Sequence, residues 1–420
     1  MKKRAVILVP SLERLERFGA RERLIRAMES YGSGFRVDRV DIENATEKDS
    51  AAVIAWDRET GEAVEMHVYE AFWGDLVPDW SKESPWARFR RGLGLIVYWA
   101  AGGVARALWR LEVPARTVLA MFVASMLLLL WYLTVIAVLV QALGTADSTM
   151  PAPIEDLLAR FGWTESIVAW TDRLRNLPLL VFLVMLFGLG RLENIANISS
   201  FIKDYLRDQQ LSRTDIGLRA KTRARLVGLL DHVTANDQDY DEVHVVGHSL
   251  GGAIAVDALA GYGRPLPRTA LHTWGAGLGL LVQQDAWVER RIGALYACPS
   301  RLADWRDVVF PSDVMASPRP LPFKYRGDRR LSEKWPEIFT PTITPHVQKR
   351  TPFAYFSTHE AYYRCTDAIR LLMDVRTPAP LAFAPLDVLP GEIPQAVSDQ
   401  RPTLPETAPS GGSGGPKLVR

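Results

Sequence analysis

The sequence predicts an α/β fold, a mainly parallel sheet flanked by helices, with an inserted α-helical membrane hairpin. An apolar β-branched run at residues 243–246 leads through a glycine-flanked serine into small residues with helical spacing. Strand-like and helix-like runs alternate on both sides of this motif. Residues 117–143 carry no charged side chain, and this run exceeds the roughly 20 apolar residues that a membrane-crossing helix needs.

The motif at Gly247 to Gly251 reads Gly-His-Ser-Leu-Gly, the pattern of a nucleophile elbow. A sharp strand-to-helix turn would expose the Ser249 hydroxyl, and the two glycines would allow neighbouring backbone to pass close by. Leu250 would present its N–H group at the start of the helix, where a developing oxyanion is stabilised. The alternative is a serine in an ordinary tight turn. A second Gly-x-Ser-x-Gly, at residues 411–415, lies in a glycine-rich tail without strand or helix signals.

Composition limits the function classes. The 420 residues contain 50 Lys and Arg against 48 Asp and Glu, a formal net charge of +2, and no basic cluster accompanies a nucleic-acid-reading motif. We therefore expect no nucleic-acid partner. The 2 cysteines, Cys298 and Cys365, are too few for a disulfide framework and lack metal-ligand spacing, so we expect neither a metal nor a cofactor and favour a reducing compartment.

The N-terminal part predicts a mixed sheet. We expect residues 5–9 to form a buried strand rather than part of a signal peptide, because Glu13 and Arg14 interrupt the apolar run. An amphipathic helix is expected at residues 14–31 and further strands at 35–42, 53–56 and 65–73.

The insertion predicts two membrane crossings, at about residues 117–143 and 177–198. The glycine-interrupted stretch at 92–105, flanked by arginines, indicates an interfacial or re-entrant helix. Because arginines crowd the segment before the first crossing, we expect both termini and the catalytic domain to be cytoplasmic.

After the insertion, the pattern predicts a helix at residues 218–235 leading into the serine motif. It then predicts a strand at 269–275, a helix at 280–295, a short strand at 302–305 and a final helix at 357–375. We divide the chain into residues 1–84 and 216–376, two parts of one α/β domain, the membrane insertion 85–215, and a disordered Pro/Gly-rich tail, 377–420.

A serine nucleophile at such a turn is followed in the chain by an acid and then a histidine. Two of the seven histidines, His346 and His359, follow the serine without lying inside a predicted strand. His359 is favoured because Ser357 and Glu360 have capping-box spacing, which would fix it at the start of the last helix.

The acid is assigned to Asp307, which follows the short strand, with Asp304 and Asp313 as competitors. The second oxyanion donor should come from the loop after the first strand. Pro10 has no N–H group, so Ser11 or Leu12 is the candidate beside Leu250.

Three stretches together resemble α/β-hydrolases of the lipase/esterase type: Val-Val-Gly-His-Ser-Leu-Gly-Gly, Trp-Arg-Asp-Val-Val and Ser-Thr-His-Glu-Ala-Tyr-Tyr. They match the elbow, acid loop and histidine loop of that family. The resemblance covers residues 5–73 and 218–375 and implies an α/β-hydrolase fold that cleaves acyl esters through a serine acyl-enzyme. One departure is Val9-Pro-Ser-Leu12, where many relatives have His-Gly.

Two functions follow as hypotheses. The first is a membrane-anchored serine hydrolase that acts on a lipid-like ester or thioester, with the bilayer beside its catalytic mouth. The second is a catalytically inactive membrane scaffold on a hydrolase fold. A transporter is disfavoured because two crossings without intramembrane polar groups provide no pathway.

Overall fold

The computed structural model describes residues 1–12, 16–32, 34–40, 50–99, 122, 125–126, 128–129, 131–132, 189–210, 215–235, 239–297, 301–310, 312–313, 316–320 and 359–374. The chain divides into two units, Met1–Leu381 and Ala382–Arg420. All described residues belong to the first unit, so the predicted tail at 377–420 lies outside them.

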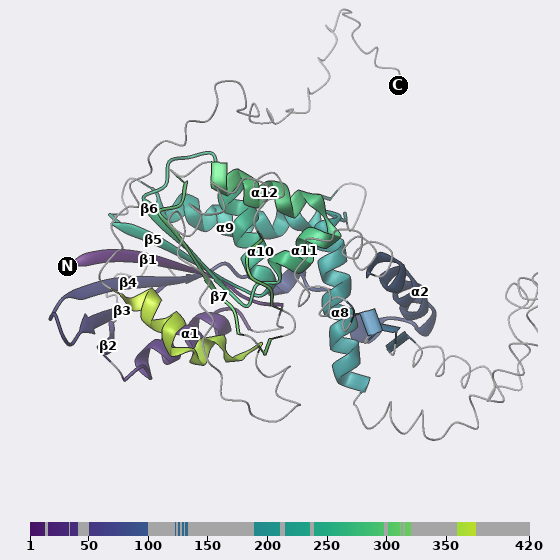
Figure 1. Cartoon of the computed structure of the whole chain (residues 1–420), viewed down its shortest axis with the longest axis horizontal. Helices are drawn as coiled ribbons and strands as arrows, with labels where there is room; N and C mark the ends of the chain where they lie inside the picture. The colour runs from purple at the N-terminus through teal and green to yellow at the C-terminus, as the bar shows by residue number, and fades with distance from the viewer. Residues whose placement is uncertain are drawn as a thin grey trace, which may run out of the picture. The chain divides into compact units, whose positions relative to one another are not determined.

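Seven strands of the described chain form one sheet in the order β2-β3-β4-β1-β5-β6-β7 (Figure 1). β4, β1, β5, β6 and β7 run parallel, whereas β2, β3 and β4 pair antiparallel. The strands are β1 (Lys2–Val9), β2 (Phe35–Val40), β3 (Ser50–Asp57), β4 (Ala63–Glu70), β5 (Glu242–His248), β6 (Arg268–Trp274) and β7 (Asp304–Val308). The predicted α/β architecture with a mainly parallel sheet is confirmed.

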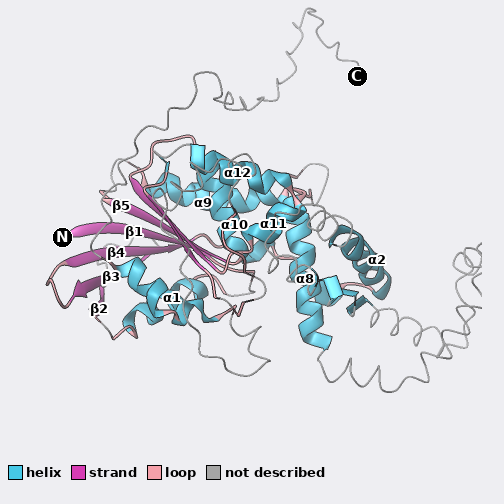
Figure 2. Cartoon of the chain, viewed as in Figure 1, coloured by secondary structure: helices cyan, strands magenta, loops and turns pink. Residues whose placement is uncertain are grey.

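Helices cover both faces of the sheet (Figure 2). The central strand β1 shows why: Ala5, Ile7 and Val9 are buried in one apolar cluster, and the alternating residues Val6 and Leu8 are buried in the other. The first face packs against α8 (Leu189–Leu206), α9 (Leu218–Val233), α10 (Leu250–Gly261), α11 (Leu278–Gln284) and α12 (Ala286–Ala297). The second face packs against α1 (Gly19–Glu29) and α16 (Thr366–Met373), the yellow-green helix of Figure 1.

Two predicted helices are divided in the structure. The stretch 280–295 forms α11 and α12, separated at Asp285, whose carboxylate accepts a hydrogen bond from the Trp287 N–H group at 2.8 Å. The last helix is a 3-10 helix, η5 (Ala361–Arg364), followed by α16 after the extended residue Cys365. The helical segment thus begins later than the predicted start at residue 357, and His359 lies in the turn just before η5.

Three described pieces of the insertion pack together: helix α2 (Pro85–Ile96), helical residues between 122 and 132, and helix α8. After two 3-10 turns, η1 (Gly74–Leu76) and η2 (Trp80–Lys82), helix α2 begins at Ser84, whose hydroxyl accepts a hydrogen bond from the Ala87 N–H group. Leu95 and Trp99 are buried against Leu128, Trp131 and Tyr132, which are helical, and against Ala196 of α8.

The predicted crossings at 117–143 and 177–198 fall largely on residues outside the described ranges. Within those ranges, no helix has both the length and the apolar character required to cross a bilayer. Residues 189–198, the described end of the second predicted crossing, form the first half of α8, which continues to Leu206. Its second half joins the apolar core of the sheet domain, where Phe201 stacks on Trp73 at 5.3 Å between ring centroids.

Candidate active site

Ser249 lies between the end of β5 and the start of α10 with φ 56° and ψ −124°. Positive φ values cost an L-residue free energy, and a serine with this backbone needs its surroundings to hold it. The Ser249 N–H group donates to the Trp274 carbonyl at 2.9 Å, and its own carbonyl accepts from the Gly252 N–H group at 3.0 Å. Both bonds fix the strained turn between strand and helix.

The glycines around Ser249 are required by close backbone contacts. A Cβ atom on Gly251 would lie 2.1 Å from the Val9 carbonyl oxygen and 2.7 Å from that of Pro10. A Cβ atom on Gly247 would lie 2.6 Å from the Gly252 Cα atom. The first turn of α10 therefore rests directly on the backbone that follows β1, which is where the second oxyanion donor was expected.

The His359 imidazole lies within hydrogen-bonding distance of the serine. Its Nε2 atom is 2.8 Å from the Ser249 hydroxyl oxygen, and its Nδ1 atom is 2.8 Å from a carboxylate oxygen of Asp313. An ionised carboxylate only accepts, so the Nδ1 atom carries the proton and donates to Asp313, while Nε2 accepts from the serine. The result is one hydrogen-bonded chain of serine, histidine and aspartate.

Asp313 is fully buried, and one of its carboxylate oxygens accepts two hydrogen bonds. Besides the His359 contact, its carboxylate accepts a hydrogen bond from the Tyr362 hydroxyl at 2.9 Å. The Tyr362 hydroxyl in turn accepts from the Phe310 N–H group at 3.1 Å. Burial, followed by the charge of Asp313, raises the pKa of Tyr362, so the phenol stays protonated and donates. The space for its ring is provided by Gly275, at which a Cβ atom would lie 2.4 Å from the tyrosine ring.

Asp307 does not occupy the position that the sequence assigned to it. It lies inside β7, and its two carboxylate oxygens accept hydrogen bonds from the Thr273 hydroxyl at 2.6 Å and from the Arg319 N–H group at 2.9 Å. The structure therefore places Asp313, one of the competitors, beside His359. The reason is that β7 continues to Val308, so its loop begins later than the predicted strand end at Trp305.

The other competitors lie elsewhere. Asp304 is at the opposite, N-terminal end of β7, where it pairs with Arg306. His346 lies outside the described residues.

His248, the residue before the serine, is fully buried beside His359. Its Nε2–H group donates to the His359 carbonyl at 2.9 Å, and the two rings stack with their centroids 5.3 Å apart. Burial, with a further contribution from His359, lowers the pKa of His248 to about 3, so its ring is neutral near pH 7. Sequence reasoning missed this role; the position of the histidine directly before Ser249 was its one signal.

Of the residues expected to stabilise an oxyanion, Leu250 directly follows the serine, whereas Ser11 and Leu12 follow the backbone that approaches Gly251. Leu250 is the first residue of α10 and is buried. Ser11 is buried in the loop that contacts Gly251, and Leu12 packs against the neighbouring apolar core. The Trp73 indole N–H group donates to the Pro10 carbonyl at 3.2 Å, which holds this loop from its other side.

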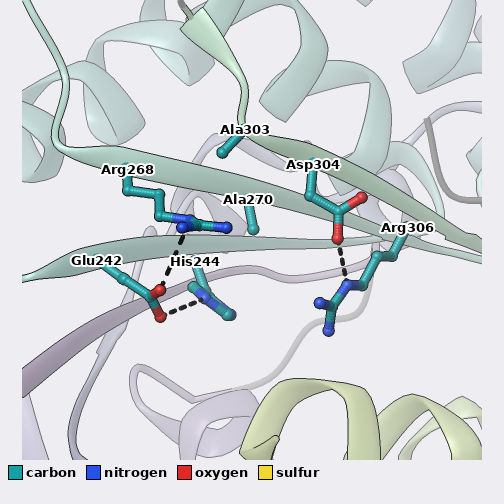
Figure 3. Close-up of a pocket in the computed structure, with 7 residues that line it drawn as sticks. All are labelled: Glu242, His244, Arg268, Ala270, Ala303, Asp304 and Arg306. Carbon is teal, nitrogen blue, oxygen red and sulfur yellow. Dashed lines mark hydrogen bonds and ion pairs between the residues drawn. The ribbon is translucent and has the colours of Figure 1, made fainter. Parts of the chain in front are cut away.

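A separate polar pocket lies at the N-terminal ends of β5, β6 and β7 (Figure 3). Ser249 follows the C-terminal end of β5, at the other end of these strands. Glu242, Arg268, His244 and the pair of Asp304 and Arg306 line it. Glu242 pairs with Lys2 and Arg4 as well as with Arg268. These mutual ion pairs neutralise the buried charges, so the pocket is a structural cluster rather than part of the serine site.

In the described part of the chain, no group of three histidine, cysteine or carboxylate side chains could hold a metal ion. Comparisons of the chain with protein-family models, with curated proteins and with solved structures find no match. The function is therefore argued from the site itself.

Proposed function

We propose that the protein is a membrane-anchored serine hydrolase with an α/β-hydrolase fold, which cleaves a lipid-like carboxylic ester or thioester through an acyl-enzyme. The observation that carries the proposal is the chain of two 2.8 Å contacts from Ser249 through His359 to Asp313. It begins at a serine held at positive φ, a strained backbone conformation of the kind that clusters at active sites. The order serine, acid, histidine along the chain is the order of this fold.

The proposed reaction follows from these contacts. The His359 Nε2 atom takes the hydroxyl proton while the Ser249 oxygen attacks the carbonyl carbon of the substrate. The Leu250 N–H group and an N–H group from Ser11 or Leu12 stabilise the oxyanion. The tetrahedral intermediate collapses, the leaving alcohol or thiol takes the proton from Nε2, and an acyl-serine remains. Water, deprotonated by His359, then releases the carboxylic acid and restores the serine.

Asp313 would orient the imidazole and stabilise its protonated form during both steps. Full burial of the carboxylate strengthens this interaction, because the effective dielectric around the pair is low. Tyr362 would support this role, because its hydroxyl donates to the same Asp313 oxygen that accepts from His359.

The lipid-like substrate class is supported by the insertion. Residues 117–143 are uncharged, and α8 brings Phe201 against Trp73, which itself holds the loop after β1. The insertion thus reaches the neighbourhood of the proposed oxyanion donors. An enzyme attached in this way could take an acyl chain from the bilayer without exposing each CH₂ group to water, at about 0.8 kcal/mol per group.

The decisive experiment is labelling with a fluorophosphonate probe, which reacts with an activated serine. The parent protein should be labelled and should hydrolyse short-chain esters, whereas Ser249→Ala should do neither and should unfold at a similar temperature. Absence of labelling in the well-folded parent would favour the alternative, an inactive membrane scaffold. Ester hydrolysis by Ser249→Ala at the parent rate would refute the nucleophile assignment.

A further inference from the structure

We propose that the exposed face of helix α2 docks on the surface of a bilayer that contains anionic lipids. This inference goes beyond the hydrolase proposal, because it concerns a surface outside the serine site and would hold for an inactive protein as well.

Helix α2 has an exposed apolar face. Trp86, Leu93 and Val97 are 49%, 49% and 58% exposed, and their spacing of seven and four residues places them on one side of the helix. Gly94 lies on the same side, and an added Cβ atom there would meet nothing within 4 Å. Most large apolar side chains in the described residues are buried. Three exposed apolar side chains in one row of a helix therefore mark an interaction surface.

The opposite side of α2 is already occupied. Leu95 is buried, and a Cβ atom on Gly92 would lie 2.5 Å from the Tyr132 ring. Phe89 also contacts the Tyr132 ring, with 5.4 Å between the centroids. These contacts fix the rotation of the helix about its axis, and the exposed row is therefore held outward rather than free to turn inward.

The charges of α2 indicate the partner. The helix contains three arginines and no acidic residue. Arg88 pairs with Glu193 at 3.2 Å and Arg91 pairs with Glu83 at 2.7 Å. Arg90 is exposed, has no acidic partner in the described part of the chain, and lies four residues after Trp86 and three before Leu93. A row of tryptophan, unpaired arginine and aliphatic residues fits the headgroup region of an anionic bilayer.

A second exposed apolar row lies on a segment that packs against α2. Phe122, Met126 and Leu129 are 51%, 43% and 37% exposed at a spacing of four and three residues. They belong to the uncharged segment 117–143, and Leu128 and Trp131 of the same segment pack in one cluster with Leu95 of α2. Among the described residues of α2 and this segment, the exposed side chains are apolar except for that of Arg90, and this composition matches a lipid surface.

The test places an environment-sensitive fluorophore on a cysteine at Leu93 in the full chain, with Cys298 and Cys365 replaced by serine and alanine. The protein is reconstituted in nanodiscs of phosphatidylcholine with or without phosphatidylserine, and quenching by aqueous iodide is measured. The matched control carries the fluorophore at Trp56, which is 41% exposed on β3 at the far side of the sheet domain.

We expect the label at Leu93 to be shielded from iodide, more strongly with phosphatidylserine, while the label at Trp56 stays accessible in both lipids. Arg90→Gln should reduce the ratio of docked to undocked protein in anionic nanodiscs about fivefold, the effect of one basic residue near such a surface. Arg58→Gln, in the exposed β3–β4 turn, should leave it unchanged.

Equal quenching at Leu93 and Trp56 would overturn the proposal. Shielding of Leu93 in detergent that grows with protein concentration would overturn it too, by assigning the face to a second copy of the chain. Repeating the measurement with Ser249→Ala separates the two proposals, since lipid docking should persist whether or not the serine is reactive.

Discussion

The buried ring of His248 donates a hydrogen bond to the backbone carbonyl of His359 and stacks on its imidazole. Two residues 111 positions apart are thereby linked at the point where the proposed base meets the serine. His248 thus holds the backbone that carries His359, while Asp313 holds the ring. The geometry of the proposed base depends on both contacts.

Replacement of His248 should therefore impair turnover without removing a reacting group. We expect His248→Leu to lower kcat by up to roughly 100-fold with little change in KM, because a small displacement of a catalytic group has this effect. His248→Gln, which retains an N–H donor, should recover part of the loss. Equal kcat values for the leucine and parent proteins would show that the contact does not position His359.

The two aspartates of the β7 region should differ sharply. Asp313→Asn removes the acceptor for the His359 Nδ1–H group and should lower kcat by about 10⁴-fold, because the wrong tautomer of the base is favoured. Asp307→Asn is the matched control. It should lower mainly the free energy of unfolding, by about 1–3 kcal/mol, because the amide NH₂ group cannot accept one of the two hydrogen bonds that the buried carboxylate accepts. The measurements are steady-state hydrolysis of a short ester and urea unfolding. The reverse ranking of the kcat losses would return the acid role to Asp307.

The sequence pointed to Asp307 rather than to Asp313, which lies beside His359, because a sequence does not mark the last residue of a short buried strand. Trp305 and Arg306 gave no turn signal, and Asp307 looked like the first loop residue. In the structure Asp307 lies inside β7, and its carboxylate accepts a hydrogen bond from the Thr273 hydroxyl of the adjacent strand. By contrast, the serine turn could be predicted, because Gly247, Gly251 and the small residues that follow are local requirements of the turn.

The strands β2, β3 and β4 pair antiparallel. The sequence pattern predicted a mixed sheet here, but it does not say which strands pair or in which direction, because pairing depends on contacts between distant residues. The His248 contact with His359 was equally invisible, because it joins distant parts of the chain. His359 could nevertheless be selected from the order of residues along the chain, although the expected helix start around it was wrong.

The backbone strain at Ser249 should be measurable as stability. Ser249→Gly should unfold at a higher temperature than Ser249→Ala, with a net gain of about 1 kcal/mol, because relief of the positive φ exceeds the entropy cost of glycine. Both variants lack the hydroxyl and should be unlabelled by a fluorophosphonate. If the alanine protein is the more stable of the two, the turn is not strained by its backbone conformation.

The pH dependence of stability should report the buried histidines. Burial lowers the pKa of His244 to about 3, as it does for His248, whereas an unfolded histidine titrates near 6.5. Between these values the unfolded chain binds more protons, so the free energy of unfolding should fall as pH drops from about 6.5 toward 3. Each group contributes up to about 1.4 kcal/mol per pH unit.

His244→Gln isolates one of these contributions and lies toward the other end of β5 from the serine. Urea unfolding of this variant between pH 7 and 4 should show a shallower decline than the parent. The comparison is needed because the raised pKa of the buried carboxyl group of Asp257 acts in the opposite direction. Parallel curves for the two proteins would mean that His244 is not held neutral by burial.

The last prediction concerns the role of the insertion in substrate supply. A deletion of residues 100–188, closed by a flexible linker, leaves α2 and α8 in the chain. Phe201 and Tyr205 hold α8 in the core of the sheet domain, and the pair of Arg88 and Glu193 still links α2 to α8. The shortened protein should be labelled by a fluorophosphonate and hydrolyse short, water-soluble esters at the parent rate. It should lose activity on long-chain esters presented in vesicles, since the acyl chain must then pass through water at about 0.8 kcal/mol per CH₂ group. Retention of the long-chain activity would show that the deleted segment serves only for attachment, whereas loss of both activities with an intact thermal transition would show that it shapes the serine site itself.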